Sequence, residues 1–207
     1  MPDLQEELDL RAAGYLSIAG VDEAGRGSWA GPVFAAAVVL SVERTDLMSL
    51  LAGVRDSKQL TAARRESLFP CIVNVAEAVG IGLASASEID ACGIVPATRR
   101  AMARAVAQLR TTVDALLIDY MVLPDVSIPQ RALPKADVRC LSVAAASIVA
   151  KVSRDRHMVA LDEQFPGYGF ARHKGYGTPE HREALARLGP TPIHRLTWEP
   201  LREAKAQ

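Results

Sequence analysis

Two acidic residues of this 207-residue chain stand at the ends of apolar segments. Asp22 ends the segment Ser17–Asp22, and Asp119 ends the segment Val113–Asp119. Both segments have the length and composition of short buried strands, so each acid is expected at the rim of a sheet, where the backbone leaves the core. A lone carboxylate is costly to bury, and acids in such places need hydrogen bonds, a basic partner or a cation.

Glu23 directly follows Asp22, and this adjacency constrains the geometry. On a regular strand the two side chains would point to opposite faces of the sheet. They can serve one site only if the strand ends or bulges there, which Gly25 and Gly27 would permit. The alternative, in which Glu23 is a solvated turn residue and Asp22 caps the turn, remains equally open on spacing alone.

Asp137 is a weaker candidate when it is taken by itself. It lies in the segment LPKADVRCLS, five residues before an expected helix, where an ordinary loop acid is the more common interpretation. A cluster of acids without nearby bases would favour Mg²⁺ or Mn²⁺, because these ions prefer oxygen ligands.

Apolar runs bounded by turn residues predict the strands that would position these acids. The predicted strands span residues 17–22, 33–40, 76–84 and 113–119. A connection rich in glycine joins the first two, which indicates an antiparallel pair. Strands that then alternate with helices indicate an α/β domain with a mixed central sheet.

Helical spacing and capping residues predict four helical segments between and after these strands. They span residues 57–69, 88–110 and 142–164, with a fourth that Thr178 opens and Gly189-Pro190 closes. Ser57 or Thr61 is a candidate cap of the first, and Ser142 is a candidate cap of the third. Pro96 is expected to break the second helix into two pieces.

The charge balance is unusual for a chain that would bind nucleic acid. Lys plus Arg and Asp plus Glu each number 24, so the formal net charge is zero. Nucleic-acid binders are usually basic, and the balance argues mildly against such a partner. The basic residues concentrate in 151–195, which also holds all four histidines, so this region is the expected phosphate-facing part.

Cysteine usage and hydropathy bound the setting of the protein. Cys71, Cys92 and Cys140 are an odd number, are widely spaced and form no CxxC pair, which favours a reducing compartment over a disulfide framework or a zinc site. The longest apolar run, Val33–Leu40, is far shorter than the roughly 20 residues that a membrane helix needs. We therefore expect a soluble, cytoplasmic protein without a membrane partner, and a monomer.

Several sequence blocks, in order along the chain, resemble those of one enzyme family. The blocks are GVDEAGRG (20–27), GPVFAAAVVL (31–40), DSKQL (56–60), LLID (116–119), KADVRCLSVAAASIVAKVSRDR (135–156), FPGYGFARHKGYGTPEHREAL (165–185) and GPTPIHR (189–195). Together they resemble the type 2 ribonuclease H family, the ribonuclease HII enzymes of bacteria.

This resemblance implies a ribonuclease H-like fold in a single domain, 1–207. A catalytic core would span about 15–165, and a small helical segment of about 166–207 would contact substrate. Asp22, Glu23, Asp119 and Asp137 would be the catalytic, metal-binding carboxylates, holding two Mg²⁺ or Mn²⁺ ions with substrate.

The implied reaction is hydrolysis of the phosphodiester at ribonucleotides in RNA/DNA hybrids and at single ribonucleotides in duplex DNA. The products would carry 5′-phosphate and 3′-hydroxyl ends. The main alternative is a catalytically silent nucleic-acid-binding module of the same fold, which predicts loss of a carboxylate. A nucleotide-using transferase would need a GxGxxG or GxxxxGK pattern, and neither occurs.

Recognition of ribose would fall to a glycine turn and an aromatic ring. Gly25, Arg26 and Gly27 would let backbone groups approach the 2′-hydroxyl, which both donates and accepts hydrogen bonds. The resemblance makes Tyr176 the ring that packs on the neighbouring deoxyribose. The structural alternatives are a tight strand connection and a partly buried loop tyrosine.

Further substrate contacts are expected from basic and polar residues. Lys58 is a candidate phosphate contact, and Ser147, Lys151 and Arg154 share one helical stripe that would face the nucleic-acid backbone. Four more candidates come from the basic region, namely His173, Lys174, His194 and Arg195.

Four positions depart from the family's common pattern. Tyr120 stands where Gly is common, Ala136 replaces Gly in KGD, Gly93 stands where Asn is usual, and Leu196 replaces the second Arg of HRR. None is among the four acids, so activity is still expected.

Overall fold

The computed structural model describes residues 1–199 and 201–204. It forms one five-stranded sheet in the order β3-β2-β1-β4-β5. The strands are β1 (Ile18–Ala24), β2 (Val33–Val39), β3 (Ala78–Ala84), β4 (Ala115–Asp119) and β5 (Gln130–Leu133). β1 pairs antiparallel with β2 and parallel with β4, so the sheet is mixed, as the sequence predicted. β5 was not predicted, because its sequence, QRAL, contains no apolar run, and its residues are only half-buried in the structure.

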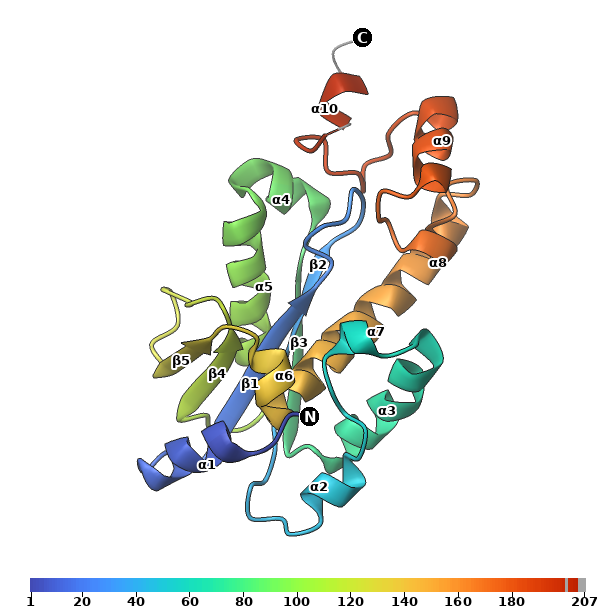
Figure 1. Ribbon diagram of the computed structural model, residues 1–207. Helices are drawn as coiled ribbons and strands as arrows, with labels where there is room; N and C mark the ends of the chain where they lie inside the picture. The colour runs from blue at the N-terminus through green and yellow to red at the C-terminus, as the bar shows by residue number, and fades with distance from the viewer. Residues whose placement is uncertain (200, 205–207) are drawn as a thin grey trace.

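Helices cover both faces of the sheet (Figure 1). The remaining elements are α1 (Gln5–Ala12), α2 (Leu47–Leu50), η1 (Ser57–Gln59), α3 (Ala62–Val75), α4 (Ala86–Cys92), α5 (Ile94–Ala107), α6 (Ala136–Arg139), α7 (Leu141–Gln164), α8 (Phe170–His173), α9 (Pro179–Leu188) and α10 (Leu201–Ala204). α5 packs on one face, and α7 with α3 packs on the other.

The core is built from small side chains, which bring the layers close together. Ala35 and Ala37 of β2 face α5, whereas Ala36 and Val38 face α7, as strand alternation requires. At Gly20 of β1 an added Cβ would collide with the backbone at the start of α7. The longest helix can therefore lie directly on the central strand that carries Asp22 and Glu23.

The segment predicted as one helix over 88–110 is divided, but not by Pro96. Gly93 has φ of 84°, ends α4 and begins α5. Pro96 lies in the first turn of α5, where a missing N–H costs no intrahelical hydrogen bond. The prediction of a break was right, and its assignment to proline was wrong.

The helix predicted over 57–69 is likewise shifted. Asp56 caps the short helix η1, and Thr61 accepts a hydrogen bond from the Arg64 N–H at 3.2 Å as the cap of α3. α3 then continues through Pro70 to Val75. Thr61 is therefore the cap of the main helix, and Ser57 lies inside the preceding turn.

α7 begins without a capping side chain of its own, so the prediction for Ser142 was wrong. Glu7 of α1 accepts hydrogen bonds from both the Ser142 N–H (2.9 Å) and the Ser142 hydroxyl (2.7 Å). A carboxylate from a distant helix thus caps α7. α1 was not predicted, because its apolar residues do not form a continuous stripe.

The C-terminal segment joins the sheet near the β1–β2 connection (Figure 1). An isolated bridge pairs Ala30 with His194, and α7 runs from the sheet into this segment. Thr178 caps α9 and Gly189 ends it, as predicted. Residue 200 and residues 205–207 of the expected substrate-contacting segment lie outside the described part of the chain. Among the described helices, none is both long and apolar enough to cross a membrane.

Candidate active site

Asp22 and Asp119 lie on neighbouring parallel strands at the same edge of the sheet. Val21 of β1 pairs with Ile118 of β4, so the acid that follows each of them is next in register. Asp22 is buried, with 3% of its surface exposed, and its Oδ1 accepts a hydrogen bond from the Glu23 N–H at 2.7 Å. The expectation that both strands deliver an acid to the rim agrees with this arrangement.

Asp137 is brought to the same edge through Asp119. The Asp119 Oδ1 accepts a hydrogen bond from the N–H of Ala136, the first residue of α6, at 2.8 Å. Asp137 is the second residue of this short helix and is 5% exposed. The hydrogen bond from Ala136 to Asp119 therefore holds Asp137 at the edge of the sheet. The interpretation of Asp137 as an ordinary loop acid, which the sequence favoured without the family resemblance, was wrong.

Glu23 is part of β1, which continues in regular register to Ala24, so the strand end or bulge expected at Glu23 is not found. Glu23 is nevertheless close to the acidic edge, because burial and then the charge of Asp119 raise its pKa. Its Oε1 accepts from the Arg26 guanidinium at 3.2 Å, and its side chain is 12% exposed. The other oxygen, Oε2, is buried with no hydrogen-bond partner. This geometry excludes the alternative in which Glu23 is a solvated turn residue.

The carboxylates destabilise one another's charged forms. Burial raises the pKa of Asp22 well above its ordinary value, and the nearby charges of Glu23 and Asp119 raise it further. Burial also raises the pKa of Glu23, although Arg26 opposes the shift. For Asp137, burial and then the charges of Asp56 and Asp119 raise the pKa. Arg26 and Lys58 supply less positive charge than the acids of the cluster require, and a divalent cation would supply more.

The acids do not form a closed coordination cage. Within residues 1–199 and 201–204, no group of three or more histidine, cysteine or acidic side chains has an arrangement that could itself hold a metal ion. The donor set nevertheless fits a divalent ion, because the atoms are carboxylate oxygens and Glu23 Oε2 is buried without a partner.

Asp56 is a further acid at this edge, and the sequence reasoning missed it. It is buried at 9% exposure, and its carboxylate accepts from the Lys58 N–H at 2.9 Å. A cavity of about 340 Å³ has Asp56, Asp119 and Asp137 in its walls. The DSKQL block contained the signal, since Asp56 precedes the lysine chosen there.

Lys58 lies at the open side of the acidic cluster. Its side chain is 77% exposed, and its Nζ is 3.6 Å from Asp137 Oδ2. Burial would lower the pKa of Lys58, but Asp22, Asp56 and the other nearby acids outweigh this effect and raise it. The ammonium group therefore stays charged next to the carboxylates.

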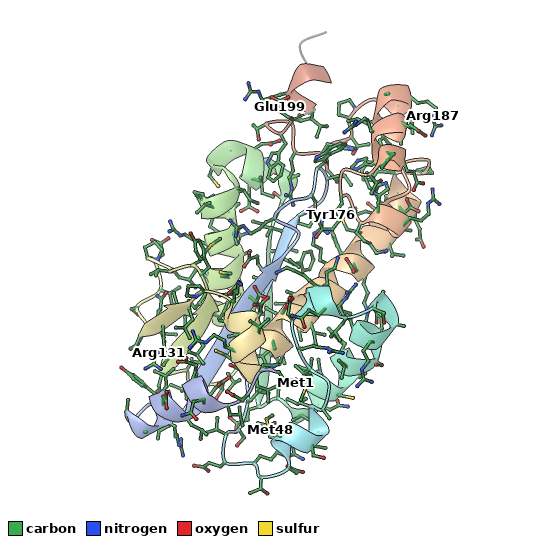
Figure 2. The ribbon with its side chains drawn as sticks, in the orientation of Figure 1. Met1, Met48, Arg131, Tyr176, Arg187 and Glu199 are labelled. Atoms are coloured by element: carbon green, nitrogen blue, oxygen red, sulfur yellow. The ribbon has the colours of Figure 1, made fainter. Side chains whose placement is uncertain are left out.

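A second cavity, of about 400 Å³, gathers half of the residues predicted to contact substrate. Its walls consist of Glu23, Ala24, Gly25, Arg26, Gly27, Ser57, Lys58, Lys151 and Tyr176. Residues from the end of β1, from η1, from α7 and from the loop before α9 thus meet at one place. Figure 2 places Tyr176 between the β1–β2 connection and α7.

The glycine turn is held from inside the protein by Arg195. Its guanidinium donates to the carbonyl oxygens of Gly25 and Arg26, both at 2.7 Å, and to that of Gly31. In a trans peptide the carbonyl and the following N–H point in opposite directions. The N–H groups of Arg26 and Gly27 are therefore turned away from Arg195.

Arg154 joins the two sides of this cavity and is not a surface contact. It is fully buried and donates to the carbonyls of Pro32, Lys174 and Ala30 and to the Ser28 hydroxyl. Gly25 has φ of 91°, and an added Cβ there would collide with this guanidinium. The prediction that Arg154 faces phosphate was wrong, because the helical stripe it belongs to turns into the core.

Other predicted contacts are buried as well. Ser147 is 2% exposed, and its hydroxyl donates to the Ser57 hydroxyl at 2.8 Å, which fixes η1 against α7. Arg195, His194 and His173 are 0%, 1% and 8% exposed. In the described structure these side chains hold loops together. The prediction that they contact phosphate is therefore wrong.

Lys151 and Tyr176 remain at the cavity. The Lys151 Nζ donates to Asp155 at 2.7 Å and lies 5.2 Å from the centre of the Tyr176 ring. The Arg154 guanidinium carbon lies 5.4 Å from the same centre. Lys174 is half-buried, and its Nζ donates to the Ala171 carbonyl. The charged groups of Lys151 and Arg154 therefore both lie near the Tyr176 ring, an arrangement that favours cation–π attraction.

The departures from the family pattern have structural explanations at two positions. Tyr120 has φ of 63°, which explains why glycine suits this place, and its ring is 73% exposed, so it does not crowd the acids. Gly93 has φ of 84° and ψ of 163°, a conformation essentially restricted to glycine, which explains the glycine at this place. Nothing in the structure explains the replacement at Leu196.

Comparisons with known proteins identify the family of this chain. A family model described as Ribonuclease HII matches residues 19–201. Ribonuclease HII of Chloroflexus aurantiacus is 57% identical over 204 residues, which cover 99% of this chain and 96% of the relative. The structure of ribonuclease H2 from Pyrococcus horikoshii OT3 matches with a TM-score of 0.76 and 30% identity, covering 92% of this chain and 97% of that one.

A chain of the PCNA:RNase HII complex from Archaeoglobus fulgidus matches with a TM-score of 0.73 and 32% identity, covering 89% of this chain and 96% of that one. The match to the family model spans both the acidic edge and the Tyr176 loop. The chain therefore belongs to the ribonuclease HII family of metal-dependent endonucleases, which hydrolyse RNA in RNA/DNA hybrids.

Proposed function

We propose that this enzyme cuts the phosphodiester at single ribonucleotides embedded in duplex DNA as well as in longer hybrids, by two-metal-ion catalysis. The observation that carries the proposal is the cavity in which Glu23, the Gly25–Gly27 turn and Tyr176 share one wall. A proposed metal ligand, a proposed ribose-sensing turn and an aromatic ring thus line one cavity.

Asp22, Glu23, Asp119 and Asp137 would hold the two ions, Mg²⁺ or Mn²⁺. When bound, such ions lower the pKa of an attacking water and stabilise the leaving oxygen. The raised pKa values of Asp22, Glu23 and Asp137 and the unpartnered Glu23 Oε2 support this assignment. The products would carry a 5′-phosphate and a 3′-hydroxyl.

The chain's own groups would bind and orient the substrate. The N–H groups of Arg26 and Gly27, turned away from Arg195, would meet the 2′-hydroxyl or the adjacent phosphate. Lys58 and Lys151 would contact phosphate on either side, since both line the cavity. This role requires Lys151 to share its ammonium group with Asp155.

Tyr176 would read the sugar that follows the ribonucleotide. An aromatic ring packs well on a deoxyribose face, whereas a ribose at that place adds a polar hydroxyl that the ring would have to desolvate. The enzyme would therefore prefer a junction where one ribonucleotide is followed by DNA.

The test uses duplex DNA that carries one ribonucleotide, incubated with Mg²⁺ or Mn²⁺, and maps the nick. We expect a single cut on the 5′ side of the ribonucleotide and no cut in an all-DNA duplex. Tyr176→Ala should lower kcat/KM on this substrate roughly ten- to hundredfold, the range expected for losing one aromatic stacking contact. Wild-type-like cutting by Tyr176→Ala would remove the ring as a reader, and uncut substrate with wild-type enzyme would refute the proposed specificity.

We further propose that the enzyme acts as a monomer in the cytoplasm. Cys71, Cys92 and Cys140 are free thiols, which suits a reducing compartment. Light scattering coupled to size exclusion tests the oligomeric state, with a mass near 22.2 kDa expected and twice that mass contradicting it.

A further inference from the structure

Three histidines form a cluster behind the Tyr176 loop that the proposed chemistry does not use. His181 and His194 are 0% and 1% exposed, and His173 is 8% exposed. The rings of His173 and His181 stack with centres 4.5 Å apart and planes 11° apart. The Nε2 atoms of His181 and His194 lie 3.1 Å from each other, within hydrogen-bonding distance.

Both ends of the His181–His194 pair determine where the protons lie. The Thr191 N–H donates to His194 Nδ1 at 2.9 Å, and the Thr191 hydroxyl, 2.8 Å from the same nitrogen, can donate to it as well, so this nitrogen is an acceptor. The carbonyl oxygen of Tyr176 can only accept, so His181 Nδ1, 3.0 Å away, must donate. In neutral rings, His194 then carries its proton on Nε2, and His181 has a lone pair on Nε2. The contact with Thr191 and the contact with the Tyr176 carbonyl thus independently require that His194 Nε2 donates to His181 Nε2.

This hydrogen-bond chain therefore runs from Thr191 through two imidazoles to the backbone of Tyr176. A second proton on His181 would sit on its Nε2 and face the Nε2–H of His194. A second proton on His194 would sit on its Nδ1 and face the Thr191 N–H. The chain is intact only while both rings are neutral and each keeps one tautomer.

The carbonyl that receives this chain belongs to a loop with a demanding backbone. Lys174 and Gly175 have φ of 53° and 80°, both in the left-handed region. The Tyr176 oxygen also accepts from the Thr178 N–H at 2.8 Å, and the Gly175 oxygen accepts from the Trp29 N–H at 2.8 Å. The Trp29 ring packs against His181, with ring centres 5.5 Å apart. The direction of the Tyr176 side chain is thus set by groups behind it.

We propose that His181 and His194 are positioning residues, a tautomer-locked neutral pair that fixes the Tyr176 ring for recognition of the ribonucleotide–DNA junction. This inference rests on the proposed role of Tyr176 as the reader. Neither histidine would touch substrate, and their effect would pass through the peptide group of Tyr176. They should therefore govern selectivity for a junction over a long hybrid more strongly than they govern cutting itself.

The two ends of His181 can be tested separately with isosteric amides. The amide nitrogen of asparagine takes nearly the place of histidine Nδ1, and that of glutamine nearly the place of Nε2. His181→Asn keeps the donor to the Tyr176 carbonyl, whereas His181→Gln removes it. We expect His181→Gln to lower the ratio of kcat/KM on a single-ribonucleotide duplex to kcat/KM on a long hybrid about tenfold, the factor of one net hydrogen bond. His181→Asn should keep that ratio within about threefold.

A double-mutant cycle separates positioning from general destabilisation. If His181 acts through the ring, adding His181→Gln to Tyr176→Ala should not lower the ratio further. His157→Asn, on α7 beside Phe34, is the matched histidine control and should leave the ratio unchanged. Thermal midpoints of all variants show whether they fold, and nitrogen chemical shifts of the wild-type imidazoles report the tautomers without any activity measurement.

The outcomes distinguish the two claims. A selectivity loss in Tyr176→Ala with none in folded His181→Gln refutes the inference and leaves the reader role intact. No selectivity loss in Tyr176→Ala refutes the reader role itself, and the inference falls with it. Additive losses in the double variant, or imidazole shifts that show the opposite tautomers, also overturn the inference.

Discussion

Asp22 is the residue at which the chemistry and the stability of this protein conflict most directly. It is buried on the central strand, beside Glu23 and next in register to Asp119, and its described hydrogen bond comes from the adjacent backbone N–H. Its raised pKa shows that the folded protein disfavours its charge. A buried carboxylate whose charge destabilises the folded protein is expected to have a functional role, here in the active site.

Asp22→Asn should therefore separate stability from turnover. Without divalent metal, we expect a thermal midpoint equal to or above that of the wild type at pH 8, because a repelled buried charge is removed. Turnover should fall more than about 100-fold. Removing a residue that hydrogen-bonds to a metal ligand typically lowers activity about 10- to 100-fold, and removing the ligand itself should lower it further. Mg²⁺ should raise the wild-type midpoint more than that of the variant. Asp125→Asn, at an exposed position, is the control, and a normal cutting rate in Asp22→Asn would contradict the metal assignment.

Sequence reasoning located some of these residues and misplaced others, for physical reasons. Asp22 and Asp119 could be found because each follows an apolar run in the sequence, whereas Asp137 needed the family resemblance. Arg154 and Arg195 were wrongly placed at the surface, because a guanidinium satisfied by backbone carbonyls leaves no pattern in the sequence. Of the histidine pair, His194 was interpreted as a substrate contact, and His181 only as part of a basic region.

At the scale of elements, α7 organises the molecule. It lies on β1, carries Lys151 to the cavity, and extends into the C-terminal segment, where Arg154 donates to the Lys174 carbonyl. Its start depends on Glu7 of α1, which replaces a local cap. The long strands and helices were predictable from their apolar periodicity. β5 and α6 are four residues each and were missed, because so short a segment shows no period.

Glu7→Ala should cost about 1–2 kcal/mol of unfolding free energy, the usual worth of a helix cap with its hydrogen bonds. Glu7→Gln, whose amide oxygen can still accept from Ser142, should cost less. Burial raises the pKa of Glu7, so its contribution to stability is greatest at low pH and falls as pH rises through the folded-state pKa. Denaturant unfolding of both variants with Asp9→Ala as the exposed control checks this, and equal costs for the Ala and Gln variants would contradict the capping role.

At the scale of the whole molecule, the chain has no net positive charge to attract a polyanionic substrate. The chain has 24 basic and 24 acidic residues, and Arg154 and Arg195 are buried as loop anchors. Binding of a polyanion should therefore depend on divalent ions at the acidic edge more than on surface arginines. The fold supplies a rigid sheet edge for these ions and a C-terminal segment that completes the cavity through Tyr176.

The C-terminal segment should also make the folded state sensitive to acid. Burial lowers the pKa of His181 and His194 to about 4, from an ordinary value of 6.5. The unfolded chain therefore binds protons first, and stability from the neutral pair is complete above pH 6.5 and is lost as pH falls toward 4. His194→Gln cannot be protonated, so its stability deficit against wild type should shrink over this range. A deficit that stays constant from pH 7 to pH 4.5 would contradict the neutral assignment.

The central claim is that four carboxylates at one sheet edge hold the ions that cut beside a ribonucleotide. Its most direct test counts the Mn²⁺ ions bound by the enzyme in complex with a duplex whose scissile linkage cannot be hydrolysed. We predict two ions with the wild type and fewer with Asp119→Asn or Asp137→Asn, while Asp125→Asn keeps both. A count of two that none of the substitutions at Asp22, Glu23, Asp119 or Asp137 reduces would contradict the account.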